Sequence, residues 1–118
     1  MLKKDNSTGA IGEKFAVKYL KKKKYKIIET NFRAKMGEID IVASKDKYIV
    51  FVEVKTRDEN SWFAPVYAVT ASKRQKIVKT AQLYLMRKKT DLQPRFDVCT
   101  VVTKEKKPIL IEHIENAF

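Results

Sequence analysis

The chain has 118 residues, 44% of them hydrophobic, which is enough to bury one core and too few to divide convincingly into two domains. Lys and Arg number 26 against 14 Asp and Glu, and this formal net charge of +12 attracts polyanions. No apolar stretch approaches the roughly 20 residues of a membrane-spanning helix, and the polar start has no signal-peptide core. We therefore expect a single cytoplasmic domain over residues 1–118. Nucleic acid is its leading partner, ahead of an anionic membrane surface or a charge that serves only solubility.

The first predicted element is a helix that is capped by Asn6 or Ser7 and ends near Lys22. Its apolar side chains recur at helical spacing and form one face: Ile11, Phe15, Ala16, Tyr19 and Leu20. Three strands follow, at residues 25–32, 38–43 and 48–55. The polar residues 44–47 predict a tight turn that joins the second and third strands into a hairpin.

A polar loop, residues 57–65, contains Trp62 and Phe63 near its end. A second helix is predicted from about Thr70 to Lys88, with an apolar stripe made of Ile77, Val78, Ala81, Tyr84 and Leu85. Residues 96–102 and 109–114 form two final predicted strands. The order α-β-β-β-α-β-β predicts an α/β fold with a mixed central sheet flanked by helices.

Acidic residues interrupt the otherwise apolar second and third strands. Alternate side chains of a strand point to the same face, so Glu53 and Lys55 project together. If Ser44 pairs with Lys47 in the hairpin, position 40 lies opposite 51 and position 38 opposite 53. Asp40, Glu53, Lys55 and Glu38 then share one face.

In this register the Asp40 and Glu53 carboxylates reach one ion, because diagonal neighbours lie roughly 7–8 Å apart at Cα. Burying unpaired charge in such strands is expensive. One interpretation is an ion pair of Lys55 with either acid. The other is a site for a hard cation, Mg²⁺ or Mn²⁺, that polarises a phosphoryl oxygen and activates water. Lys55 would then position or deprotonate the water, or stabilise the developing charge.

The runs Gly37-Glu-Ile-Asp40 and Phe51-Val-Glu53-Val-Lys55 resemble the endonuclease-like YraN group of bacterial proteins. That group belongs to the PD-(D/E)XK nuclease superfamily and is similar to archaeal Holliday-junction resolvases. The resemblance covers nearly the whole chain, from Gly12-Glu13 to Arg95-Phe96-Asp97, although Ile39 stands where the superfamily name has Pro. It implies a restriction-endonuclease-like core and a metal-dependent endonuclease that acts on nucleic acid, structured or branched DNA above all.

The resemblance also implies roles for single residues. Asp40 and Glu53 match the metal-binding acids, Lys55 the catalytic lysine, and Glu13 the acidic residue that such enzymes place on the first helix. Glu38 matches a family position and serves either as a supporting carboxylate or as a salt-bridge partner.

Basic residues near the predicted site are candidates for binding nucleic acid. Lys73, which also matches a basic family position, and Lys76 lie one helical turn apart and could contact neighbouring phosphates. Arg57, just after Lys55, would point near the same face and could also contact a phosphate. Lys88 is better explained by the favourable placement of cations at a helix C-terminus.

The remaining chemically active residues have structural interpretations. Cys99 is expected to be a buried apolar residue, Asp97 a structural acid, and His113 a partly exposed strand residue. One Cys and one His cannot make a four-ligand zinc site. Trp62 and Phe63 could stack on bases, cover the core or mediate a dimer.

Three functions are compatible with these observations. The first is a metal-dependent endonuclease, as a homodimer if it acts like a resolvase on four-way junctions. The second is a nucleic-acid-binding module that keeps a nuclease-like fold without turnover. The third is an interaction protein whose positive charge docks an acidic partner.

Overall fold

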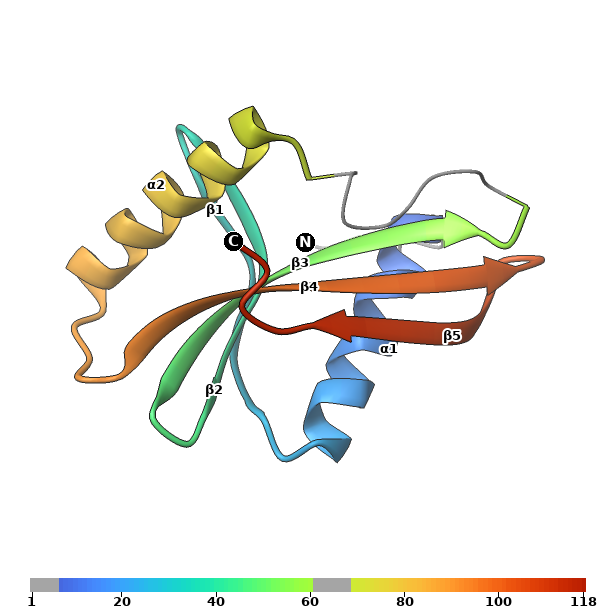
Figure 1. The fold of residues 1–118 in the computed structure, drawn as a ribbon, viewed down its shortest axis with the longest axis horizontal. Coiled ribbons are helices and arrows are strands. Elements are labelled where there is room, and N and C mark those ends of the chain that lie inside the picture. Colours follow the sequence, from blue (N-terminus) through green and yellow to red (C-terminus); the bar gives the residue numbers. More distant parts are fainter. Residues whose placement is uncertain (1–6, 61–68) are drawn as a thin grey trace, which may run out of the picture.

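A computed structural model describes residues 7–60 and 69–118. The elements are α1 (Thr8–Lys22), β1 (Lys26–Ala34), β2 (Gly37–Lys45), β3 (Tyr48–Asp58), α2 (Ala71–Arg87), β4 (Gln93–Lys104) and β5 (Lys107–Ile114). The strands form one sheet in the order β1-β2-β3-β4-β5, in which only β3 and β4 run parallel (Figure 1). The predicted α/β class, element order and mixed sheet are confirmed. Trp62 and Phe63 lie outside the described residues.

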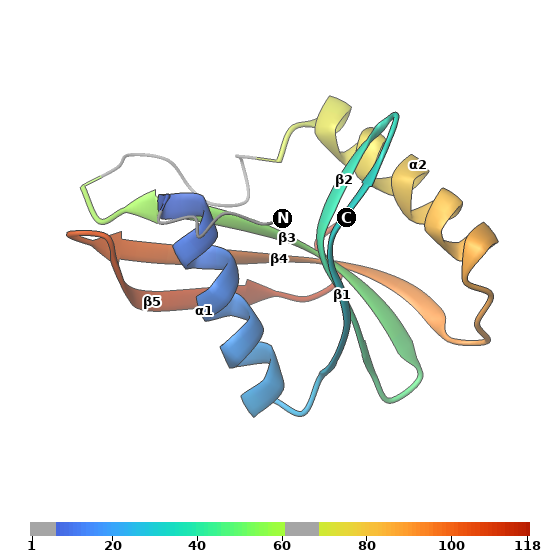
Figure 2. The same cartoon turned by 180° about the vertical axis from the view of Figure 1, so that it is seen from behind.

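The two helices cover opposite faces of the sheet, as the front and back views show (Figures 1 and 2). Ala16 and Leu20 of α1 pack on one side in a buried cluster with sheet residues that include Val50, Val52, Cys99 and Val101. Ile77, Ala81 and Tyr84 of α2 pack on the other side with residues that include Phe32, Ile39, Phe51 and Val98. The helical spacing of these apolar residues therefore predicted the buried faces.

Hydroxyl side chains cap both helices. Ser7 Oγ accepts a hydrogen bond from the Ala10 N–H at 3.2 Å, which confirms one of the two predicted caps of α1. Thr70 Oγ1 accepts one from the Lys73 N–H at 3.2 Å. Each cap satisfies a backbone donor that the first helical turn leaves without a partner, and so fixes where the helix begins.

The hairpin between β2 and β3 differs from the predicted register by one residue on each strand. Lys45 pairs with Tyr48, so the two-residue loop is Asp46-Lys47, with Asp46 at φ 54°. Asp is among the residues that tolerate this left-handed conformation, which hairpin turns require. Because the loop still has two residues, Asp40 and Glu53 stay on one face as predicted, and a continuation of the ladder beyond Ile41 and Val52 would set Asp40 across from Glu53 rather than diagonal to it.

The paired strands β1 and β2 turn over at Asn31: beyond this point, side chains that would face one side of the sheet face the other. Thr30 pairs with Ile41 and Phe32 with Ile39, which sets Asn31 across from Asp40. Asn31 has φ 54°, a left-handed conformation that Asn adopts more readily than most residues. As a result Ile41 packs with α1 whereas Ile39, two residues away, packs with α2.

A buried network of charged groups holds the C-terminal segment. Asp97 is fully buried and accepts two hydrogen bonds from Arg95, at 2.9 and 2.7 Å, one from the Asn116 N–H at 3.0 Å, and a 2.7 Å contact from His113 Nε2. These bonds keep the pKa of Asp97 below its usual value despite burial. The structural role of Asp97 is thus supported.

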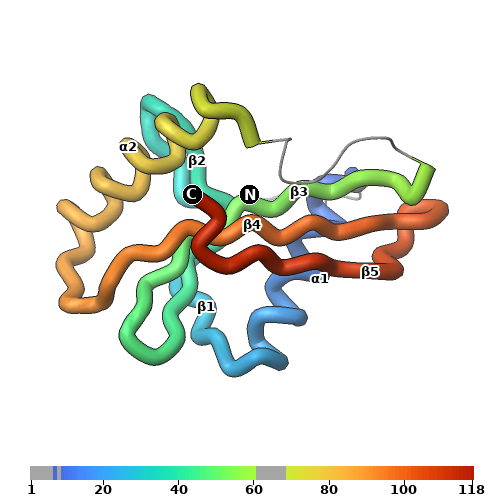
Figure 3. Tube along the Cα trace, in the orientation of Figure 1, coloured from blue at the N-terminus to red at the C-terminus, as the bar shows by residue number. Residues whose placement is uncertain are grey.

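His113 is partly exposed as a residue, as predicted, but its side chain is only 5% exposed and lies 3.3 Å from Tyr19 Oη. Cys99 is buried as predicted, and burial raises the pKa of its thiol to about 12. Beyond the network the chain turns back across β4 toward α2 (Figure 3), and Phe118 stacks on Phe96 at a ring distance of 5.3 Å.

In the part of the chain that the structure describes, neither helix is long and apolar enough to span a membrane.

Gly12 permits the close approach of α1 to β3. A Cβ atom at this position would overlap the Thr56 hydroxyl, and Thr is a stiff β-branched residue that cannot easily withdraw. We predict that Gly12→Ala lowers the free energy of unfolding by about 1–3 kcal/mol, the usual cost of overpacking.

Gly9→Ala is the matched control, because the nearest atom to its new methyl group is Ser7 Oγ at 4.0 Å. It should stabilise the protein by about 0.5–1 kcal/mol through helix propensity. Chemical denaturation of both variants measures the difference. Equal stabilities would show that α1 does not depend on this contact.

Candidate metal centre

The candidate centre lies where β2 separates from β3. The ladder of paired residues between these strands ends at Ile41 and Val52, and the next step would pair Asp40 with Glu53. Instead the Asp40 side chain enters the sheet, and its Oδ2 accepts a hydrogen bond from the Val54 N–H at 2.8 Å. A backbone N–H of the neighbouring strand β3 therefore holds the Asp40 carboxyl group in place.

Asp40 and Glu53 lie side by side and are both 9% exposed. Burial first, and then the charge of Glu53 and a hydrogen bond between the two carboxyl groups, together raise the pKa of Asp40 to about 8, against the lowering effect of the Val54 N–H. At neutral pH Asp40 is therefore mostly protonated when no cation is bound. This is the expected behaviour of two acids that share a site of low polarity.

Two lysines from different elements meet the same oxygen of Glu53. Lys55 Nζ lies 3.6 Å and Lys73 Nζ 3.8 Å from Glu53 Oε2. Burial and the neighbouring Lys73 lower the pKa of Lys55, although Glu53 opposes this. The sequence predicted Lys55 at this place, whereas for Lys73 it predicted contact with phosphate rather than with Glu53.

Glu13 approaches the centre from α1. Its carboxylate accepts a hydrogen bond from the Asn31 side chain, and its pKa is raised mainly by burial, with smaller effects from Glu38 and Glu53. Among residues 7–60 and 69–118, no three His, Cys, Asp or Glu side chains are grouped closely enough to hold a metal ion. The acids that meet directly are Asp40 and Glu53, and Glu13 acts on them through charge.

Glu38 does not share the face of Asp40 and Glu53, contrary to the strand-alternation prediction. It pairs with Arg33 across the β1–β2 ladder at 3.4 Å and is a half-exposed salt-bridge partner. The physical reason is the turn-over at Asn31, which reverses the faces of β2 beyond Asp40. Of the two predicted roles for Glu38, the structure shows the salt bridge.

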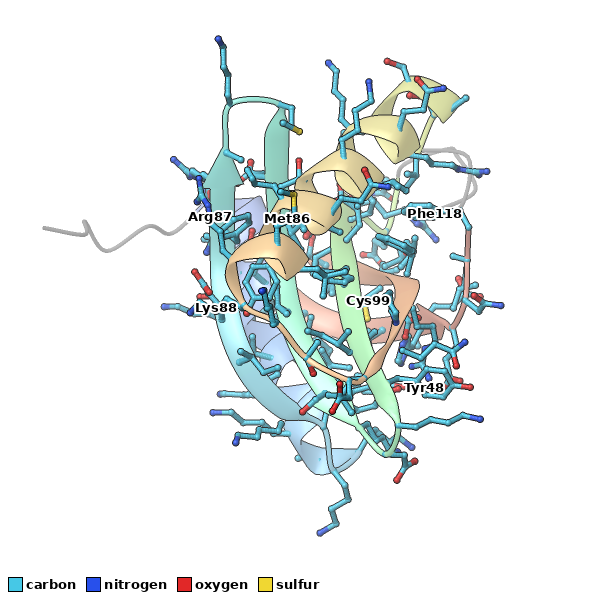
Figure 4. The ribbon with its side chains drawn as sticks, turned by 90° about the vertical axis from the view of Figure 1, so that its left-hand side faces the viewer. Tyr48, Met86, Arg87, Lys88, Cys99 and Phe118 are labelled. Atoms are coloured by element: carbon cyan, nitrogen blue, oxygen red, sulfur yellow. The ribbon has the colours of Figure 1, made fainter. Side chains whose placement is uncertain are left out.

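The other predicted basic residues lie on β3, on α2 and at the end of α2. Arg57 is half-buried on β3, where its carbonyl accepts a 3.4 Å hydrogen bond from Thr103 Oγ1. Lys76 is exposed one turn after Lys73 on α2. Lys88 pairs with Glu29 at 3.8 Å at the far end of the helix, where Figure 4 shows it beside Met86 and Arg87.

Sequence reasoning missed Asn31 and the Val54 N–H. Asn31 was counted as one more residue of an alternating strand, although an Asn in such a run is a signal for a left-handed break. Val54 acts through its backbone N–H, which every residue except proline has. The type of side chain therefore could not predict where the ladder between the strands ends.

The arrangement fits a hard divalent cation on chemical grounds. It offers two carboxyl groups whose oxygens lie together, and carboxylate oxygens are the ligands that Mg²⁺ and Mn²⁺ prefer. Burial and the neighbouring Glu53 raise the pKa of Asp40, so the pair ionises fully only when further positive charge offsets the burial of both carboxylates, which a divalent cation would do. In the metal-free protein, Lys55 and Lys73 partly compensate the charge of Glu53.

The fold and the site define an α/β protein with a mixed sheet. Two carboxyl groups lie together in this sheet, beside one lysine from β3 and one from α2. The sequence profile described as "Uncharacterised protein family UPF0102" matches residues 12–101. A UPF0102 protein of Caldanaerobacter subterraneus is 48% identical over 115 residues, which cover 95% of this chain and 94% of that protein. One from Geobacter metallireducens is 47% identical over 115 residues, 97% and 93% of the two chains. The chain belongs to the UPF0102 family.

Asp40→Asn should stabilise the metal-free protein at neutral pH. The pKa of Asp40 is higher in the folded state than its ordinary 3.8, so its favourable contribution is complete below 3.8 and is lost as the pH rises toward 8. Asn keeps an oxygen for the Val54 N–H and carries no charge. We expect a gain of about 1–3 kcal/mol at pH 7 that shrinks below pH 4.

Urea denaturation at several pH values in the presence of a chelator measures this gain. Asp46→Asn, which makes the same change in the exposed hairpin turn, is the control and should alter stability little. A loss of stability in Asp40→Asn at pH 7 would mean that Asp40 is ionised and paired in the folded state.

Proposed function

We propose that this protein is a metal-dependent endonuclease of the PD-(D/E)XK type that hydrolyses phosphodiester bonds in nucleic acid. The observation that carries the proposal is the meeting of Asp40, Glu53 and Lys55 on adjacent strands, with Asp40 and Glu53 hydrogen-bonded and Lys55 3.6 Å from Glu53. This is the acid pair and lysine that the sequence resemblance assigns to catalysis. An α/β core with a mixed sheet between two helices is compatible with that superfamily.

Asp40 and Glu53 would hold Mg²⁺ or Mn²⁺, with Glu13 as a further acidic neighbour. When bound, the ion would supply Lewis acidity toward a phosphoryl oxygen and toward the attacking water. The Val54 N–H would keep the Asp40 carboxylate oriented while it exchanges its proton for the ion. Such support from a neighbouring group is how ligand geometry is usually fixed.

Lys55 would act on the attacking water. Its ammonium group lies beside Glu53, and its lowered pKa makes the neutral amine more accessible than in an exposed lysine. The amine could accept the proton of the water, and the ammonium could stabilise charge on the phosphate. Both roles need the position next to the acids that β3 gives it.

The net charge of +12 supports nucleic acid as the substrate class. Lys73 pairs with Glu53, Lys76 lies one turn further along α2, and Arg57 lies two residues beyond Lys55 on β3. These three residues would contact phosphates around the scissile bond. The resemblance to junction resolvases favours structured or branched DNA over RNA, and cleavage of a four-way junction would need a homodimer with two symmetric sites.

A nucleic-acid-binding module without turnover is the second candidate. It is favoured by the self-neutralised state of the centre, in which Asp40 is protonated and Glu53 is flanked by two lysines. In that case Asp40→Asn would leave DNA binding unchanged or improve it, and divalent metal would matter little.

Cleavage assays with duplex, flap, four-way-junction and single-stranded DNA, and with RNA, test the proposal in Mg²⁺ and Mn²⁺. We expect the wild type to cut at least one substrate. Asp40→Asn, Glu53→Gln and Lys55→Ala should each reduce the rate by about 100-fold or more, as loss of a catalytic group does.

Asp46→Asn is again the matched control and should keep full activity. A correctly folded wild type that cuts none of these substrates with either ion would contradict the nuclease assignment. Activity that persists in Asp40→Asn and in Glu53→Gln would place the reaction elsewhere in the molecule.

A further inference from the structure

We propose that Lys73 is an exchangeable counterion of the centre: it neutralises Glu53 in the metal-free protein, and a divalent cation displaces it so that its ammonium group becomes available to a phosphate. The inference rests on the proposed metal site and adds a link between metal occupancy and phosphate binding.

Lys73 lies on α2. It lies in the first turn, where its own N–H is used by the Thr70 cap. The positive end of the helix dipole disfavours a cation there, and the first turn has no acidic residue to offset it. Glu53 of β3, 3.8 Å away, is the acid with which Lys73 pairs.

A cation at the acid pair would compete with this ion pair. Lys73 Nζ approaches Oε2 of Glu53, and a carboxylate oxygen that binds a hard cation cannot also keep an ammonium group close without repulsion between them. The same repulsion acts on Lys55, which approaches the same oxygen.

The two lysines differ in their freedom to leave. Lys55 is only two residues from Glu53 on the same strand, and its side chain is 24% exposed. Lys73 belongs to a different element, and its side chain is 46% exposed. Lys73 is therefore the group that can turn away toward solvent, and it stays near enough to meet a phosphate that approaches the ion.

Linkage gives this exchange a measurable consequence. Whatever binds Glu53 in competition with the cation weakens the apparent metal affinity, so removing the Lys73 charge should strengthen it. Isothermal titration calorimetry with Mn²⁺ alone, without nucleic acid, measures the affinity directly. We expect Lys73→Met to bind Mn²⁺ about 5–10-fold more tightly than the wild type, the size of effect that one charge exerts on a divalent ion through water at roughly 6 Å.

Two variants test the physical cause. Lys73→Arg keeps the charge and should stay within about twofold of the wild type. Lys76→Met removes the same charge one turn further along α2 and should also stay within about twofold, since screening weakens the more distant charge. Because the Lys73 side chain is half-exposed, its replacement should leave the fold intact, and thermal unfolding of each variant checks this.

Unchanged or weaker Mn²⁺ binding in Lys73→Met would overturn the inference, as would equal strengthening in Lys76→Met or in Lys73→Arg. Failure of the proposed function has a different signature. In that case the wild type would show no Mn²⁺ binding, or binding that Asp40→Asn does not reduce.

Discussion

Two carboxyl groups meet in the sheet of this protein at a place where water is largely excluded. Asp40 and Glu53 are each 9% exposed and share a hydrogen bond. Both cannot carry a charge there unless a cation lies with them, because their repulsion is barely screened at low polarity. The raised pKa of Asp40 follows from this constraint, and the bond from the Val54 N–H and the two lysines beside Glu53 offset part of it.

The fold sustains this costly arrangement by bringing several elements to one point. The β2–β3 ladder ends just before Asp40, and the left-handed Asn31 turns β1 and β2 over beside it. The absence of a side chain at Gly12 lets α1 approach β3 and carry Glu13 inward. On the other face the Thr70 cap fixes the first turn of α2, which carries Lys73.

The sequence predicted the features that depend on local patterns. Helical and strand periodicity located all seven described elements, and the alternation of β3 put Glu53 and Lys55 on one face. It could not predict the role of Glu38, because strand alternation fails where Asn31 reverses the faces. It also could not predict the contacts of the His113 side chain, because its partners Asp97 and Tyr19 are distant in sequence.

The central claim is that Asp40 and Glu53 together hold one divalent cation. Anomalous diffraction from crystals grown with Mn²⁺ tests it most directly, because the signal locates the ion without reference to activity. We predict one peak within about 2.0–2.4 Å of an oxygen of each carboxylate, the distance typical of such ligands. A peak elsewhere, or an acid pair that keeps its hydrogen bond and its lysines at saturating Mn²⁺, would contradict the account.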